Sequence, residues 1–215
     1  MNKVFLYLYP IEEFTKIFIF DDDSLYDELN IQRPFPILNE CIKKRYRDNG
    51  YKVVFAMYPD KEIFGLEKKD EDQIIYSDIT FKQASGYYED GREKPKSEIM
   101  YSDEQYLISQ LGNVDELVVG GYHYSDCVKR LAEEAIETGI DTLVDLDLTD
   151  LFFGLYKNEN YFKIDEYDKE RYKDYLINLE KFLDGNAKSY EEYSEWFNKM
   201  YSSPAYGFNN KGKTR

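Results

Sequence analysis

The sequence predicts a three-layer α/β fold in which a mainly parallel sheet is flanked by helices. Short apolar runs of strand length alternate with helical patterns, which is typical of α/β domains. Twice, a helical pattern, a glycine and an apolar strand follow one another with a very short joint, as in a βαβ unit. The chain has 215 residues, of which 42% are hydrophobic, so one domain with a substantial core is expected.

The first predicted βαβ unit lies near the N-terminus. Pro36 opens a helical pattern that ends at Gly50, a residue suited to the conformation that closes a helix. An apolar strand begins immediately after this glycine. Another apolar run, nearer the N-terminus, ends in an acidic cluster that begins with Asp21. The strands predicted in this part cover residues 4–8, 16–20 and 51–58.

The second predicted βαβ unit follows a polar, irregular excursion over residues 65–98. Its second helix carries an apolar stripe that includes Val128, Leu131 and Ala135, as expected for a helix that packs on a sheet. The predicted strands cover residues 74–76, 116–121 and 140–148, and the predicted helices cover residues 102–112 and 127–139.

The character of the sequence changes near residue 155. Beyond it, charged segments with a stripe of Tyr, Leu and Phe predict a helical extension over residues 156–200. We expect this extension to pack on the α/β domain of residues 1–155 or to serve in a homo-oligomer. Residues 201–215 are expected to form a flexible tail.

The charge of the chain argues against several classes of partner. It has 28 basic and 43 acidic residues and a net charge of -15, which repels nucleic-acid phosphates and anionic membranes. No apolar run approaches the length of a membrane span, and the N-terminus lacks the features of a signal peptide. We therefore expect a cytoplasmic protein in which Cys41 and Cys127 are free thiols.

Cys127 is the best chemical candidate in the sequence. It follows the strand predicted over residues 116–121 and stands in the first turn of the next helix, where Ser125 can act as the N-cap. The partial positive charge of a helix N-terminus favours a thiolate, and free amides there can hold an oxyanion. Ligands bind beyond the carboxyl ends of parallel strands, so the position suits a nucleophile. The alternative is that Cys127 is a small residue that packs the helix on the sheet.

The segment VVGGYHYSDCVKRLAEEAIETGIDTLVDLDLTDLF resembles the cysteine-hydrolase segment of the isochorismatase-like superfamily, which includes the nicotinamidases. In that family an apolar strand ends in glycine, and a short loop leads to a catalytic Cys-Val pair and a helix with packing alanines. The matching residues are Gly121, Cys127, Val128, Ala132, Ala135 and Gly139. The resemblance runs from about Pro36 to Leu151, is strongest over its last third, and implies a Rossmann-like sheet.

The resemblance also implies a mechanism. Family members hydrolyse small amide-type substrates through an acyl-enzyme on cysteine, with an Asp as base and a Lys that supports the charge. Carried over to this chain, the nucleophile is Cys127 and the base is Asp21. The lysine is Lys94, with Lys96 as the alternative, and the amides of His123 and Cys127 would hold the oxyanion. A nicotinamidase-type metal site needs several histidines and the chain has one, so no metal or other cofactor is expected.

The sequence departs from the family pattern in two places. The stretch KVFLYLYPIEEF puts Tyr9 where the family has its acid, whereas KIFIFDDDSLY puts Asp21 there. In the loop before Cys127, His123 and Tyr124 replace small residues. We assign Tyr9, His123 and Tyr124 to the pocket for a small-molecule substrate. If Tyr9 holds the acid position, the chain is a catalytically degenerate member that serves as a binding or assembly module.

A third hypothesis is a divergent Mg²⁺-dependent phosphatase. Two segments resemble the Asp-x-Asp-x-Thr opening motif of the haloacid-dehalogenase phosphatases. One contains Asp21 and Asp23, and the other contains Asp145, Asp147 and Thr149. Such an enzyme needs a carboxylate nucleophile, a second Asp as acid or base, and Mg²⁺. Acidic residues at strand ends, in a chain with 43 of them, are the simpler explanation.

Overall fold

The sheet of this protein has five strands in the computed structural model, which describes residues 1–19 and 35–150. All neighbouring strands in this part of the chain are parallel, in the order β3-β2-β1-β4-β5. The strands are β1 (Lys3–Leu8), β2 (Lys52–Met57), β3 (Gln73–Tyr76), β4 (Glu116–Gly121) and β5 (Asp141–Thr149). The order reverses its direction between β1 and β4, which makes this pair the topological switch point of the sheet.

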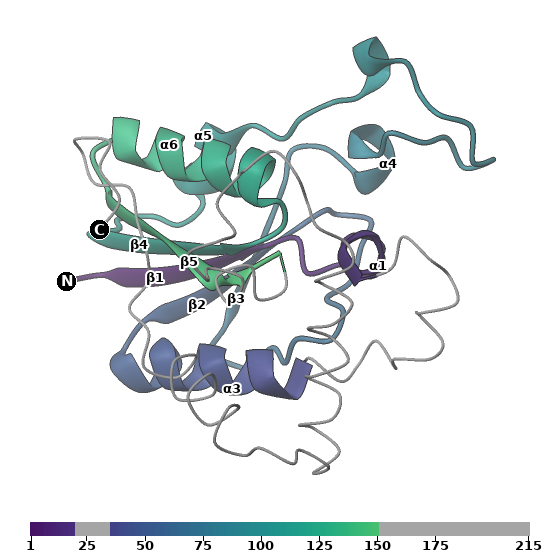
Figure 1. The fold of residues 1–215 in the computed structure, drawn as a ribbon. Coiled ribbons are helices and arrows are strands. Elements are labelled where there is room, and N and C mark those ends of the chain that lie inside the picture. The colour runs from purple at the N-terminus through teal and green to yellow at the C-terminus, as the bar shows by residue number, and fades with distance from the viewer. Residues whose placement is uncertain (20–34, 151–215) are drawn as a thin grey trace, which may run out of the picture.

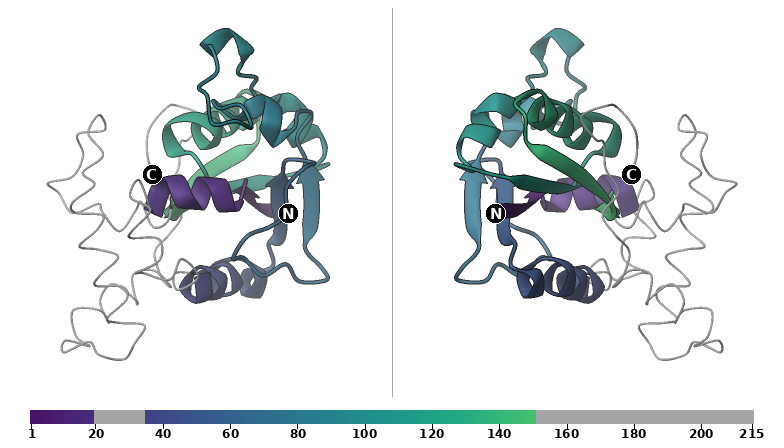
Figure 2. Two further views of the ribbon diagram at one scale, coloured as in Figure 1. Left: turned by 90° about the vertical axis from the view of Figure 1, so that its right-hand side faces the viewer. Right: turned by 90° about the vertical axis from the view of Figure 1, so that its left-hand side faces the viewer.

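Helices cover both faces of the sheet, so the predicted three-layer α/β fold is confirmed. Helix α3 (Phe35–Arg45) lies on one face, and α5 (Glu104–Ser109) and α6 (Lys129–Glu137) lie on the other (Figures 1 and 2). Because neither face meets water, β1 is an almost continuous apolar run rather than an alternating one, and its Phe5, Leu6 and Leu8 are fully buried.

The elements that contact the sheet bury apolar residues at helical spacing. In α6 the buried residues are Leu131, Ala132 and Ala135, which belong to the stripe expected from the sequence. In α3 the fully buried residues include Leu38 and Cys41. The predicted helix end is also confirmed, because after a short 3-10 turn Gly50 adopts a left-handed conformation with φ 75°.

One predicted strand is wrong. Residues 16–20 were expected to form a strand, but Glu12–Ile19 form helix α1, which follows β1 at the carboxyl end of the sheet (Figure 1). Helical spacing explains the difference, because Ile11, Phe14 and Thr15 are all buried on one side of this segment. Two glutamates in the first turn, Glu12 among them, also favour a helix at its positive end.

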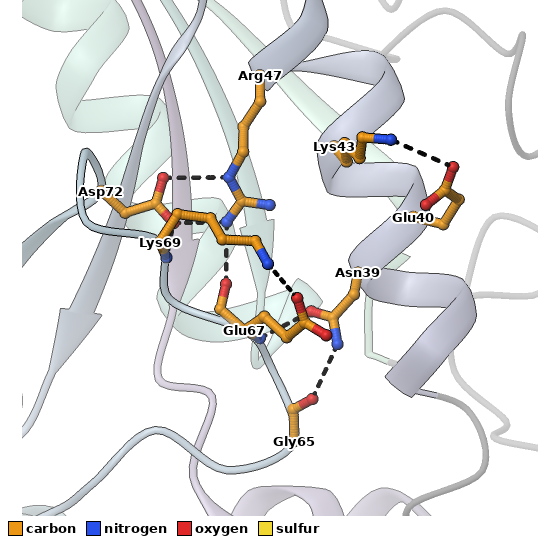
Figure 3. A network of polar contacts seen from close by, with 8 residues as sticks. All are labelled: Asn39, Glu40, Lys43, Arg47, Gly65, Glu67, Lys69 and Asp72. Carbon is orange, nitrogen blue, oxygen red and sulfur yellow. Dashed lines mark hydrogen bonds and ion pairs between the residues drawn. The ribbon is translucent and has the colours of Figure 1, made fainter.

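The excursion that begins near residue 65 is attached to α3 and the turn after it by a polar network (Figure 3). The Arg47 guanidinium donates to both carboxylate oxygens of Asp72 and to the Glu67 carbonyl at 3.0 Å. The Asn39 side chain donates to the Gly65 carbonyl at 3.2 Å and accepts from the Glu67 amide at 2.8 Å. These contacts fix the segment that leads into the edge strand β3.

The structure tests the other predicted strands, but it does not describe the predicted C-terminal segments. The strands over residues 4–8, 51–58, 74–76, 116–121 and 140–148 are confirmed within one or two residues. The helical extension over residues 156–200 and the tail over residues 201–215 lie outside the described residues. No helix in the described part has both the length and the apolar character that a membrane span requires.

Candidate active site

The carboxyl ends of β1, β2 and β4 are level with one another. Leu8 at the end of β1 pairs with Ala56 on one side and Gly121 on the other. The residues that leave these strands therefore meet at one edge of the sheet, at the switch point where open α/β sheets bind their ligands. The residues that do so are Tyr9, Tyr58, Tyr122 and His123.

Aromatic rings fill this edge. The rings of Tyr9 and Tyr58 are stacked, with centroids 4.3 Å apart and an interplanar angle of 13°. Phe14, from the helix after β1, touches both tyrosines and lies with its ring centroid 4.5 Å from that of His123. Such offset and edge-on contacts stabilise a cluster beyond the apolar area that it buries. These rings form a well-packed apolar environment for the groups that lie next to them.

The turn from β4 to α6 has an unusual backbone that brings Cys127 to this edge. Gly121 has φ 102°, and a Cβ atom there would lie 2.3 Å from the Leu8 carbonyl oxygen, so only glycine fits beside β1. The peptide bond between Tyr122 and His123, one residue further on, is cis. A wide helical turn over Tyr124–Val128 follows, in which the His123 carbonyl accepts from the Val128 amide at 3.0 Å.

Cys127 lies in this turn and is half-buried. Its thiol donates a long hydrogen bond to Asp126 Oδ2, with 4.0 Å between sulfur and oxygen. Burial, together with the negative charge of Asp126, raises the pKa of the Cys127 thiol to about 12. The positive charge of Arg130 and a backbone hydrogen bond with His123 lower this pKa but are outweighed. The thiolate expected from the helix N-terminus is therefore not the resting form of Cys127.

Arg130 connects the turn to helix α5. Its Nη2 lies 2.7 Å from Glu104 Oε1, and its Nε lies 3.2 Å from Asp126 Oδ1. The guanidinium also stands over the ring of Tyr101, 4.5 Å from the centroid. One cation is thus shared by two carboxylates and one aromatic face immediately beside Cys127.

Tyr9 directly follows the end of β1, at the carboxyl edge of the sheet. The residue is buried, has φ 51°, and donates its backbone amide to the Ala56 carbonyl at 2.9 Å. It lies close enough to Cys127 for the two groups to interact electrostatically, and burial raises the pKa of the Tyr9 phenol. The hydroxyl is beside Ser102, but no hydrogen bond of ordinary geometry joins it to any described residue.

The other predicted site residues are placed as follows. The Lys94 ammonium donates to the Lys82 carbonyl and stands 5.7 Å from the Tyr88 ring centroid, and no hydrogen bond or ion pair within the described part joins it to Cys127. Lys96 is exposed in a short 3-10 turn. Asp21 lies outside the described residues, and the strand expected to end at it is a helix.

The two predicted pocket residues in the loop before Cys127 are His123 and Tyr124. Tyr124 begins the wide turn, which places its backbone beside the site. His123 is half-buried, and burial lowers the pKa of its imidazole to about 4, so the ring is neutral at neutral pH.

The charged residues around Cys127 were not among the site residues predicted from the sequence. Asp126 and Arg130 are four residues apart, a spacing that places two side chains on the same side of a helix and was visible in the sequence. Glu104 could not be found in this way, because it comes from α5 and reaches the site only through the packing of α5 against α6.

Of the two segments behind the phosphatase hypothesis, the one with Asp21 and Asp23 lies outside the described residues, and the other has its first carboxylate engaged in structural contacts. Asp145 in β5 is fully buried and accepts two hydrogen bonds from Arg45, at 2.9 and 3.0 Å, and one from Tyr46. Thr149 of the same motif donates its hydroxyl to the Asp145 carbonyl at 2.7 Å. The described residues also contain no group of three or more His, Cys, Asp or Glu side chains that could hold a metal ion.

Comparison with known proteins finds similarity only at the level of structure. No protein-family model matches the chain, and no curated protein matches it significantly. An isochorismatase family protein from Desulfovibrio vulgaris is 16% identical, with a TM-score of 0.43 over 69% of this chain and 81% of that one. A putative MAR1 ribonuclease from Leishmania major is 10% identical, with a TM-score of 0.45 over 95% and 93% of the two chains.

A third similar structure is the N-carbamoylsarcosine amidase from Thermoplasma acidophilum. It is 15% identical, with a TM-score of 0.43, and the alignment covers 84% of this chain and 93% of that one. The family whose resemblance was found in the residues around Cys127 is thus represented among the similar structures.

Proposed function

We propose that the chain is a cysteine-dependent hydrolase of isochorismatase-like type that cleaves a small amide-type substrate through an acyl-enzyme on Cys127. The chemistry begins with loss of the thiol proton to a base. The sulfur then attacks the amide carbonyl, the amine leaves with a proton, and water hydrolyses the thioester to regenerate the thiol.

The position of Cys127 is the observation that supports this proposal. A half-buried thiol lies beyond the level carboxyl ends of β1 and β4, at the switch point of the sheet, and it faces a carboxylate. A thiol that only packed a helix on the sheet would not need a carboxylate as its neighbour, and Cys41, which is fully buried in the core of α3, is of that structural kind.

The experiment is acylation and turnover with defined probes. Purified protein is treated with para-nitrophenyl acetate, and the acetylated residue is located by mass spectrometry. Primary amides such as benzamide and nicotinamide are then tested for ammonia release. We expect acetylation of Cys127, its loss in Cys127→Ala, and its retention in the matched Cys41→Ala variant. An unmodified Cys127 would sink the proposal.

A second candidate is favoured by one observation, the buried aromatic Tyr9 at the family's acid position. In this case the chain is a degenerate member that binds a small molecule or assembles into an oligomer without acyl transfer. This function predicts that Cys127→Ala changes neither ligand binding nor the oligomeric state in analytical ultracentrifugation, while no probe amide is cleaved.

A further inference from the structure

We propose that Asp126 accepts the proton of Cys127 and that Arg130 positions Asp126, so that the turn carrying the nucleophile also carries its carboxylate, and the first turn of α6 carries the cation. This inference rests on the proposed cysteine chemistry. It assigns the base to a residue next to the nucleophile, in place of an acid at the end of β1, and the positive charge to an arginine in place of Lys94.

The two oxygens of the Asp126 carboxylate have separate partners. Oδ2 lies 4.0 Å from the Cys127 sulfur, and Oδ1 lies 3.2 Å from Arg130 Nε. The second contact is an ion pair without hydrogen-bond geometry at Nε, and its charge attraction keeps Oδ1 beside the guanidinium while Oδ2 lies on the side of the thiol. A sulfur–oxygen distance of 4.0 Å is long for proton transfer. Catalytic hydrogen bonds are often long without substrate and shorten when it binds.

Arg130 is held on three sides, which makes it suited to positioning. Besides Asp126, it pairs with Glu104 of α5 at 2.7 Å and stands over Tyr101 at 4.5 Å. These two ion pairs and the ring contact together favour one place for the guanidinium, and its charge favours a position of the Asp126 carboxylate beside it. Glu104 acts on the thiol through Arg130, and its negative charge also raises the pKa of Cys127 directly.

The other groups that face Cys127 are poor proton acceptors. Tyr9 and Tyr58 approach from the ends of β1 and β2, and burial raises the pKa of both phenols, so they remain neutral. Within the described residues, Asp126 is the carboxylate that lies within hydrogen-bond reach of the sulfur.

The proposed step balances without any added reagent. The proton of the thiol passes to Asp126 Oδ2 as the sulfur–carbon bond to the substrate carbonyl forms. The same proton then passes to the leaving nitrogen as the carbon–nitrogen bond breaks. In the second half, water gives a proton to the carboxylate and its oxygen to the acyl group, and the carboxylate returns that proton to the sulfur.

The pH dependence of acylation tests this assignment. For the wild-type protein we expect the rate of Cys127 acetylation by para-nitrophenyl acetate to stay flat from about pH 6 to about pH 9, because a carboxylate removes the proton from a neutral thiol. For Asp126→Asn we expect a slower reaction at neutral pH that rises about tenfold per pH unit, because only solution hydroxide then produces the thiolate.

Two further variants complete the experiment. Glu133→Gln removes an exposed carboxylate from the same helix and serves as the matched control, with an unchanged flat profile. Arg130→Gln lowers the plateau, and Arg130→Lys restores part of it. The inference is overturned if wild type and Asp126→Asn both rise with pH and the variant is faster throughout, because Asp126 then only repels the thiolate. Absence of acetylation at Cys127 in the wild type removes the proposed function itself.

Discussion

Cys127 and the aromatic side chains around it are held in their neutral forms by burial. Desolvation raises the pKa of the thiol and of the phenols of Tyr9 and Tyr58, and it lowers the pKa of His123. The charged groups closest to Cys127 in the described part of the chain are Asp126 and its ion-pair partner Arg130, which also pairs with Glu104. Any acyl transfer here must therefore begin from a neutral thiol, and proton removal is the step on which the chemistry depends.

The depressed pKa of His123 makes the stability of the fold dependent on pH. The unfolded chain binds a proton at His123 near its ordinary value of 6.5, whereas the folded chain does so only near about 4. The stabilisation is thus fully present above about pH 6.5 and is lost as the pH falls toward about 4, by roughly 3 kcal/mol in total.

Urea unfolding of wild type and His123→Gln between about pH 7 and about pH 4 measures this effect. We expect the free energy of unfolding of the wild type to fall more steeply than that of the variant, with the difference concentrated below about pH 6.5. Parallel curves for the two proteins would show that His123 is protonated equally in both states.

The contact between β1 and β4 allows no side chain at Gly121. A Cβ atom there would lie 2.3 Å from the Leu8 carbonyl oxygen and 2.5 Å from its nitrogen, which are both backbone atoms that cannot move aside. We expect Gly121→Ala to lower the free energy of unfolding by roughly 3 kcal/mol or more and to displace the turn that carries Cys127.

Gly86→Ala is the matched control for this substitution. At that glycine a Cβ atom would meet only the end of the Ile99 side chain, at 3.8 Å. Its thermal unfolding midpoint should stay close to that of the wild type, and its free energy of unfolding should change by no more than about 0.5 kcal/mol. If Gly121→Ala lowered the free energy of unfolding as little as Gly86→Ala does, β1 and β4 could move apart at that point without a loss of stability.

Helix α3 is tied to β5 by a buried ion pair. Arg45 donates to both oxygens of Asp145, and both side chains are almost completely buried. We expect Asp145→Asn or Arg45→Met alone to cost about 3–5 kcal/mol in urea unfolding, since each leaves one buried charge without its partner. The double variant Arg45→Met, Asp145→Leu should be clearly more stable than the sum of the two single losses indicates. Strictly additive losses would contradict this account of the pair.

The architecture of the described residues could be predicted because its signals are local. Apolar runs, helical stripes and glycine joints each lie within a few residues of the element that they define, and strands such as β2 and β4 follow directly from them. The helix over Glu12–Ile19 was misread because four apolar residues in a five-residue window, 16–20, resemble a strand, and the buried face that decides the matter begins at Ile11.

The candidate site could be predicted only in part, because most of it is assembled from different strands and helices. The position of Cys127 follows from its own segment. The stacking of Tyr9 on Tyr58, and the link from Arg130 to Glu104, depend on the sheet order and on the contact of α5 with α6. Neither contact can be predicted from the spacing of residues along the chain. The resemblance predicted Lys94 as the lysine of the site, but its contacts in the structure are with Lys82 and Tyr88.

The reactivity of Cys41 can show whether α3 and the sheet unfold together. Cys41 is fully buried in α3, which packs on the sheet and is tied to β5 through Arg45, so its thiol cannot meet a reagent while α3 stays in place. If α3 and the sheet unfold together, the labelling of Cys41 by iodoacetamide requires global unfolding.

We therefore expect the free energy obtained from the labelling rate of Cys41, in the Cys127→Ala background, to equal the free energy of unfolding measured by circular dichroism. The two should also fall with urea at the same slope, because the same surface is exposed in both measurements. A lower value and a smaller slope from labelling would mean that α3 opens by itself. The ion pair between Arg45 and Asp145 would then break before the sheet unfolds, and the core on that face would be a separate unit from the one that supports Cys127.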